Sequence, residues 1–183
     1  MKKFVYCAAL LALTLGLSCC SKIEDVFNGN DKDAIAPVAT TYSEENAEVN
    51  LSGDWQHLVV RDILYQVGLI DQENPFMAAA LVINDNSIIE DVLAEYEGKI
   101  EINVPEIDFD KYSLVVGSCL FGNGLCYLAN QRIKNSSSGV KLYLEVCERK
   151  DVAGIQAVFN YYFASLYPKL PSGEVEVIRW DNI

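Results

Sequence analysis

The sequence predicts an α+β domain in which a mainly antiparallel sheet, curled into a sandwich or a partial barrel, packs against one or two helices. Three observations indicate this class. Hydrophobic residues make up 51% of the 183-residue chain, which is enough to bury a core. Helical patterns lie in the first part of the apolar region. From residue 99 onwards, apolar residues alternate at the strand period and turn signals separate the runs.

Two segments have the helical period. The first starts at Asp54, a possible N-cap, and ends at Gly68, with apolar residues at every fourth position between them. Its β-branched residues leave a strand as the alternative. In the second, Ser87 and Glu90 form a capping box and the apolar period continues to Gly98. The second pattern therefore predicts a helix between Ser87 and Gly98.

Strand patterns occupy most of the remaining sequence. They lie at residues 76–83, 99–104, 112–118, 125–134, 140–147 and 174–178. Between two of these strands, the five residues 135–139 (Asn-Ser-Ser-Ser-Gly) form a strong turn signal. A hairpin register that pairs Ile133 with Val140 gives one mostly apolar face. A slip of one residue would set apolar side chains against polar ones.

The same register places Cys126 directly opposite Cys147. Because the export signal described below implies an oxidising compartment, we predict a Cys126–Cys147 disulfide, with Cys119 left as a buried thiol. The alternative is a Cys119–Cys126 disulfide across the bend at residues 122–124. The cysteines lack the spacing of a metal site and the single histidine, His57, is far away in the sequence, so no metal or other cofactor is expected.

The N-terminus has the organisation of a signal peptide. Two lysines precede an apolar stretch, residues 4–17, which is too short to span a bilayer as a helix. The following Leu17-Ser18-Cys19-Cys20 resembles the lipobox of bacterial lipoproteins, in which a branched apolar residue stands three positions before the lipidated cysteine. The resemblance implies that residues 1–19 are removed and that Cys20 carries the lipid. An ordinary secretory signal with two incidental cysteines is the alternative.

The rest of the chain divides into two parts. Residues 20–50 are polar and acidic without a helical or strand period, which predicts a flexible tether, and residues 51–183 are expected to form one domain. The acidic residues just after Cys20 resemble the surface-export signal of Bacteroidetes lipoproteins, although an ordinary solvated linker has a similar composition. We therefore expect a lipid-anchored outer-membrane protein that faces either the periplasm or the cell surface.

Charge and motifs exclude several functions. The net charge of −12 and the lack of a basic run argue against nucleic-acid binding, and they leave a lipid anchor as the means of membrane contact. The common catalytic motifs are missing, and nothing marks His57 as a base, so an enzyme is not expected. The alternating carboxylates of Glu106, Asp108 and Asp110 could hold a calcium ion, but a solvated strand edge is the favoured interpretation.

The order of segments over residues 80–183 gives a family resemblance. Val82-Ile83 runs into the predicted helix, Pro105–Lys111 leads into the strand at 112–118, and Tyr167–Pro171 precedes the last strand. This order resembles the C-terminal domain of the protease-complex subunit family PrcB and small Bacteroidetes lipoproteins of the same layout. The resemblance implies a compact β-rich domain that assists or binds another protein. The family's glycine-rich bend is present here only as Gly122-Asn123-Gly124.

These patterns predict a lipid-anchored cell-envelope protein that binds another macromolecule, such as an envelope protein, without catalysing a reaction. One alternative is a glycan-binding accessory lipoprotein, in which Tyr161, Tyr162 and Tyr167 form a stacking platform. Such residues also commonly fill a core and its rim. The other alternative is a small enzyme with an unrecognised site, in which Cys119 and His57 are conceivable partners.

Overall fold

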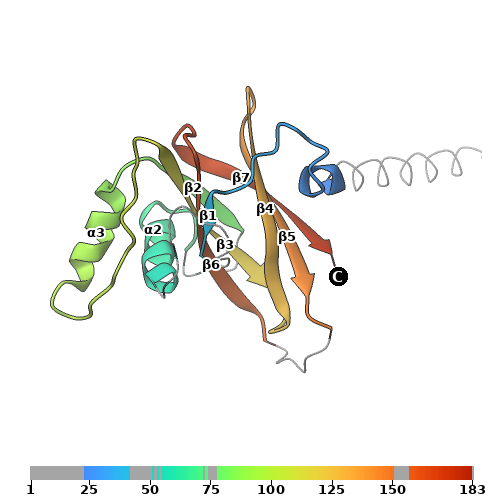
Figure 1. The fold of residues 1–183 in the computed structure, drawn as a ribbon. Coiled ribbons are helices and arrows are strands. Elements are labelled where there is room, and N and C mark those ends of the chain that lie inside the picture. The colour runs from blue at the N-terminus through green and yellow to red at the C-terminus, as the bar shows by residue number, and fades with distance from the viewer. Residues whose placement is uncertain are drawn as a thin grey trace, which may run out of the picture.

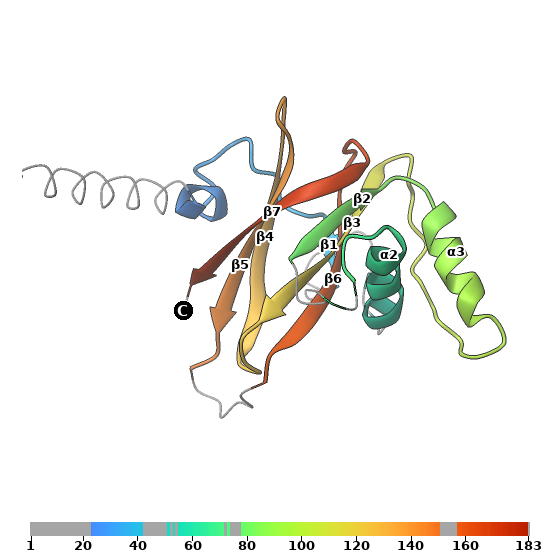
Figure 2. The same cartoon turned by 180° about the vertical axis from the view of Figure 1, so that it is seen from behind.

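The computed structural model describes residues 23–41, 51, 53, 55–71, 73, 78–150 and 157–182. Seven strands form one sheet in the order β1-β6-β3-β2-β7-β5-β4, and the sheet curls into a half-barrel with α2 and α3 on one outer side (Figure 1). Figure 2 shows the same arrangement from behind. Neighbouring strands are antiparallel except β5 and β7, which are parallel. The predicted α+β class is confirmed.

The elements have the following bounds. The strands are β1 (Ala39–Thr40), β2 (Ala79–Ile83), β3 (Tyr112–Phe121), β4 (Cys126–Ser136), β5 (Gly139–Glu148), β6 (Phe159–Pro168) and β7 (Gly173–Asn182). The helices are the π-helical turn η1 (Gln56–Val60), α2 (Arg61–Gln66) and α3 (Ser87–Tyr96). Residues 23–27 are also helical. We refer to η1, α2 and α3 together as the helical layer.

Strand β3 lies between two apolar cores because its side chains alternate between the two faces of the sheet. Leu114 and Val116 pack against the helical layer, whereas Val115, Cys119 and Phe121 point into the half-barrel. A strand that is buried on both faces is apolar along most of its length, which explains why this segment has no polar alternation. We call the cluster beneath the helical layer the outer core and the cluster inside the half-barrel the inner core. The outer core holds the helices in place.

Both predicted helices are present. The first is η1 followed by α2, which excludes the strand alternative, and the second is α3. Each ends next to a glycine with positive φ, Gly68 at 73° and Gly98 at 74°. The predicted capping box at the start of α3 is wrong. The Oδ1 atom of Asp85 accepts a hydrogen bond from the backbone N–H of Ser87 at 2.9 Å, so the cap comes from a residue two positions earlier.

The predicted strand at residues 99–104 is wrong as well. These residues form no strand pair, and the segment continues in irregular conformation to residue 108. Ile102 and Val104 nevertheless pack against the outer core, together with buried Ile107. The alternating pattern therefore reflects contact with the helical layer instead of membership of the sheet.

The β4–β5 hairpin has a different register from the predicted one. Ile133 pairs with Leu142 instead of Val140, because both strands continue up to a two-residue turn at 137–138. A bulge just after Leu128 inserts one extra residue into β4 and changes the register again. The bulge lets inward-facing residues on both sides of it remain in the core.

This register separates the cysteines that were predicted to pair. Cys147 lies opposite Tyr127, and it alternates with the fully buried Val146, which points into the half-barrel. Cys126 instead packs against the inner core. The predicted Cys126–Cys147 disulfide is therefore not formed, and Cys119, Cys126 and Cys147 are all free thiols in the structure.

Residues 23–41, called the N-terminal segment below, are part of the fold, so the predicted flexible tether is wrong for this stretch. Ile35 and Ile133 of β4 exchange backbone hydrogen bonds of 2.8 and 2.9 Å, and β1 pairs with β6. The segment thus links β4, which is one edge strand of the curled sheet, to β6 near the opposite edge. Beneath it, the Nε2 atom of Gln131 in β4 donates to the Oγ atom of Ser165 in β6.

The remaining N-terminal predictions concern other residues. The predicted signal peptide, Cys20 and residues 42–50 of the predicted tether all lie outside the described residues. Among the helices that the structure describes, none is both long enough and apolar enough to cross a membrane.

Candidate functional site

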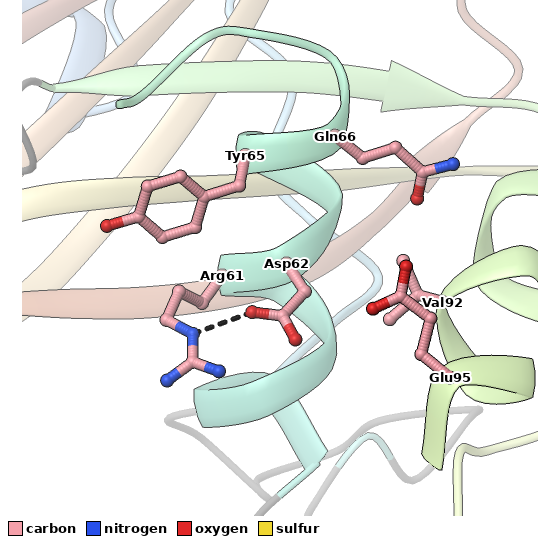
Figure 3. Close-up of a pocket in the computed structure, with 6 residues that line it drawn as sticks. All are labelled: Arg61, Asp62, Tyr65, Gln66, Val92 and Glu95. Carbon is pink, nitrogen blue, oxygen red and sulfur yellow. Dashed lines mark hydrogen bonds and ion pairs between the residues drawn. The ribbon is translucent and has the colours of Figure 1, made fainter. Parts of the chain in front are cut away.

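A groove between α2 and α3 is the candidate site. It encloses about 570 Å³ and is lined by Arg61, Asp62, Tyr65, Gln66, Val92 and Glu95. Figure 3 shows Gln66 reaching from α2 toward α3, while Arg61 and Tyr65 extend along the other side of α2. The lining therefore includes a cation, carboxylates, a phenol and an amide.

The amphipathic pattern of the helices places these side chains at the surface. Ile63 and Leu64 of α2 are fully buried in the outer core, as are Val59 and Val60 of η1. The neighbouring polar residues of α2 must then point outward. The π-helical turn η1 precedes α2 directly, and such turns are frequent near functional sites.

Arg61 and Asp62 of α2 form a closed network with Tyr96 of α3. The Nε atom of Arg61 donates to Oδ1 of Asp62 at 2.7 Å, and the hydroxyl of Tyr96 donates to Oδ2 of the same carboxylate. The Nη2 atom of Arg61 also lies 3.4 Å from the Tyr96 oxygen, which accepts its proton. The network joins α2 to α3 across the groove.

The network moves each group away from titration at neutral pH. Burial raises the pKa of Asp62, but the hydrogen bonds from Arg61 and Tyr96 outweigh burial, and the net pKa lies below the usual value. The hydrogen bond to Asp62 raises the pKa of Arg61, and the same carboxylate raises the pKa of Tyr96. A general acid or base works best with a pKa near the working pH, and none of these three shifts moves a pKa toward neutrality.

The aromatic residues predicted as a platform are not brought together. Tyr161 stacks on Phe121 in the inner core with ring centroids 5.1 Å apart, and Tyr167 is fully buried in the same core. Tyr162 lies on the opposite face of β6, against the helical layer. Burial, and to a smaller extent the nearby Tyr65, raises the pKa of Tyr162. Of the three, Tyr162 is the one close to the groove.

The conceivable pair of Cys119 and His57 is also separated. Cys119 points into the half-barrel and is 0% exposed, whereas His57 is exposed on η1 at the other face of the sheet. Burial raises the pKa of the Cys119 thiol to about 11, which leaves almost no thiolate at neutral pH. Cys119 therefore has the environment of a core residue.

The acidic residues considered for calcium are used locally. Asp108 forms an ion pair of 2.9 Å with Lys111 and accepts a hydrogen bond from the backbone N–H of Asp110. In the part of the chain that the structure describes, no three His, Cys, Asp or Glu side chains are grouped so that they could hold a metal ion. The donor set thus gives no reason to place a cation here.

The groove was not found from the sequence. Arg61 and Asp62 are adjacent and Tyr96 follows 35 residues after Arg61, so no local motif links them. They meet because α2 and α3 pack on the same core. No protein-family model, curated protein or solved structure matches the chain.

Proposed function

We propose that this chain is a lipid-anchored protein of the cell envelope, held in the outer membrane through Cys20, that binds another protein through the α2–α3 groove and catalyses no reaction. The observation that carries the proposal is the Arg61–Asp62–Tyr96 network. It links α2 to α3 beside a polar groove and favours the charged forms of Arg61 and Asp62. Fixed donors and acceptors of this kind give specificity to a protein interface.

The remaining groove side chains provide the contacts for a partner. Gln66 and Glu95 are exposed, and Tyr65 is half-buried. Tyrosine and arginine are the residue types that most often contribute strongly to protein interfaces. The resemblance to the PrcB domain family implies the same kind of role, that of assisting or binding another protein.

The anchor is tested by acyl labelling in cells. Labelling should be lost in Cys20→Ala and retained in Cys19→Ala, because the branched residue of the lipobox stands three positions before Cys20. Labelling that persists in Cys20→Ala would contradict the anchor, and loss in Cys19→Ala alone would move it by one residue.

Binding is tested by site-specific photo-crosslinking in intact cells. A photoreactive residue at position 66 or position 95 should capture the same partner protein, since both side chains reach into the groove (Figure 3). The control position is Ser138, which is exposed in the β4–β5 turn. Equal capture of the partner protein from all three positions, or no capture from positions 66 and 95, would contradict the proposal.

A glycan is the second candidate ligand, because Tyr162 lies near Tyr65 at the groove and aromatic faces bind sugar rings. The same crosslinking experiment separates the two ligands. An adduct that contains sugar and no second polypeptide, as identified by mass spectrometry, would favour the glycan.

A further inference from the structure

We propose that the end of the molecule formed by residues 23–27 and the adjoining parts of β5 and β7 lies against the lipid bilayer, so that the α2–α3 groove faces away from the membrane. This inference rests on the proposed lipidation of Cys20. It adds a fixed orientation, which a lipid anchor alone does not provide.

The first argument is that the N-terminal segment is held to the domain at several points. The Phe27 ring stacks on Trp180 of β7 with centroids 5.5 Å apart and an interplanar angle of 16°. Asp31 forms a 2.7 Å ion pair with Lys134 of β4. Ile35 then joins the edge of β4 through two backbone hydrogen bonds. The path of the chain is therefore set from residue 23 onwards.

The second argument is the length of chain between the lipid and the docked helix. Cys20 and Ile23 are three residues apart, and even a fully extended backbone spans at most about 11 Å over that distance. A free tether of the length predicted from the sequence, residues 20–50, would have reached about 30 Å by random-coil scaling. The domain cannot turn freely on so short a connection.

The third argument is the surface beside the attachment point. A cavity of about 550 Å³ lies between residues 23–32 and the sheet, with apolar walls from Ile23, Val26, Tyr143 and Ile178. Lys32 stands at the same cavity, as do Asp25 and the ion-paired Asp31 and Lys134. Apolar side chains and a tyrosine at one surface suit the boundary between acyl chains and headgroups, and the long side chain of Lys32 can extend to that boundary. The bilayer is therefore the occupant that fits this end.

The fourth argument is the position of the groove. The helix at residues 23–27 and helix α3 lie at opposite ends of the molecule in both views (Figures 1 and 2). When the first end contacts the bilayer, the second projects into the aqueous phase. A partner protein can then reach the groove without displacing lipid.

The orientation is tested with the purified full-length lipidated protein in vesicles of phosphatidylethanolamine and phosphatidylglycerol that contain a lipid with a headgroup nitroxide. Such a nitroxide quenches tryptophan fluorescence over a short range. The two tryptophans report on the two ends, because Trp180 stacks on Phe27 and Trp55 is 3% exposed in the outer core. Quenching of Trp180 should exceed quenching of Trp55 several-fold.

The two tryptophans are separated by a substitution. Trp180→Phe keeps an aromatic ring against Phe27 and should remove most of the quenchable emission, leaving Trp55 emission that the nitroxide barely affects. Equal quenching of wild type and Trp180→Phe would overturn the orientation.

A linker variant is the matched control. Insertion of about 20 Gly and Ser residues after Lys22 gives a span of about 25 Å and leaves the fold untouched. This variant should still float with the vesicles but lose the quenching of Trp180. Flotation with unquenched Trp180 in the wild type would contradict the orientation and leave the anchor standing. Failure of the wild type to float would overturn the anchor and the orientation together.

Discussion

The N-terminal segment and the helical layer both lie on the outside of the half-barrel, and different contacts hold them there. The helical layer buries whole apolar faces, with Ile63 and Leu64 at 0% exposure. The N-terminal segment has smaller and scattered apolar contacts, through Val26, Phe27, Ile35, Val38 and Ala39. It adds backbone hydrogen bonds to β4 and β6 and an ion pair with Lys134. Apolar area dominates folding free energy, whereas a single hydrogen bond contributes about 1 kcal/mol.

Because of this difference, we expect the two regions to respond differently to mutation. Damage to the helical layer exposes a core that the sheet shares, so the whole domain loses stability. The N-terminal segment can detach locally while the half-barrel stays folded, so the loss there is limited to the free energy of docking. Each prediction below tests one side of this comparison.

The largest effect is expected from Leu64→Ala in α2. Removing this fully buried side chain should lower the free energy of unfolding by about 2–5 kcal/mol, because a cavity is left in the outer core. Urea denaturation measures the loss. Val67→Ala is the control, since Val67 is 39% exposed and a surface substitution should change stability by less than about 0.5 kcal/mol. Similar losses for both variants would show that α2 does not pack as described.

Phe27→Ala should have a smaller effect, a loss of about 1–2 kcal/mol, because it removes the stacking on Trp180 and the segment can detach alone. The measurement is urea denaturation followed by tryptophan fluorescence and by circular dichroism. The fluorescence of Trp180 should change at lower urea than the circular dichroism of the sheet. Asn28→Ala, at an exposed neighbour, is the control and should leave both transitions in place.

Asp62→Asn should cost about 1 kcal/mol at pH 7, because charge-assisted hydrogen bonds are lost at a partly exposed site. The pKa of Asp62 is lower in the folded protein than its ordinary 3.8, so the stabilisation is complete above that value. It should disappear as the pH falls through the folded pKa.

Denaturation of wild type and Asp62→Asn at several pH values between 7 and 3 checks this dependence. The difference between the two curves should shrink only in the acidic part of the range. Asp91→Asn, at an exposed carboxylate of α3, is the control. A difference that is constant with pH would mean that the ionised form of Asp62 contributes nothing.

The smallest effect is expected at the ion pair between Asp31 and Lys134. Their side chains are 22% and 27% exposed, and pairs near the surface contribute less than about 1 kcal/mol. A double-mutant cycle with Asp31→Asn and Lys134→Met measures the coupling. A coupling larger than that of the Phe27–Trp180 pair would reverse our view that the aromatic contact holds the segment.

The parts of the fold that could be predicted are those with local signals. Helix α3 follows from its apolar period and from Gly98, and β3 follows from a short, continuous apolar run. The register of the β4–β5 hairpin could not be predicted, because the bulge after Leu128 and the two-residue turn leave no clear mark in the sequence. The polar N-terminal segment was missed because backbone hydrogen bonds leave no pattern of side chains.

The groove could not be predicted for a similar reason. Arg61, Asp62 and Tyr96 become neighbours when α2 and α3 pack on one core, and their sequence spacing carries no chemical signature. The predicted aromatic platform failed for the opposite reason, because residues that are close in sequence lie on different faces of β6. Tyr162 faces the helical layer, whereas Tyr161 and Tyr167 face the inner core.

The N-terminal segment is part of the folded domain in this structure. Hydrogen–deuterium exchange of a lipid-free form that starts at Ser21 measures whether it is docked in solution. The amide protons of Ile35, Val38 and Thr41 should be strongly protected, because each is donated to a backbone oxygen of β4 or β6 at 2.7–3.0 Å. Exchange of all three at the rate of an unstructured peptide would contradict the account.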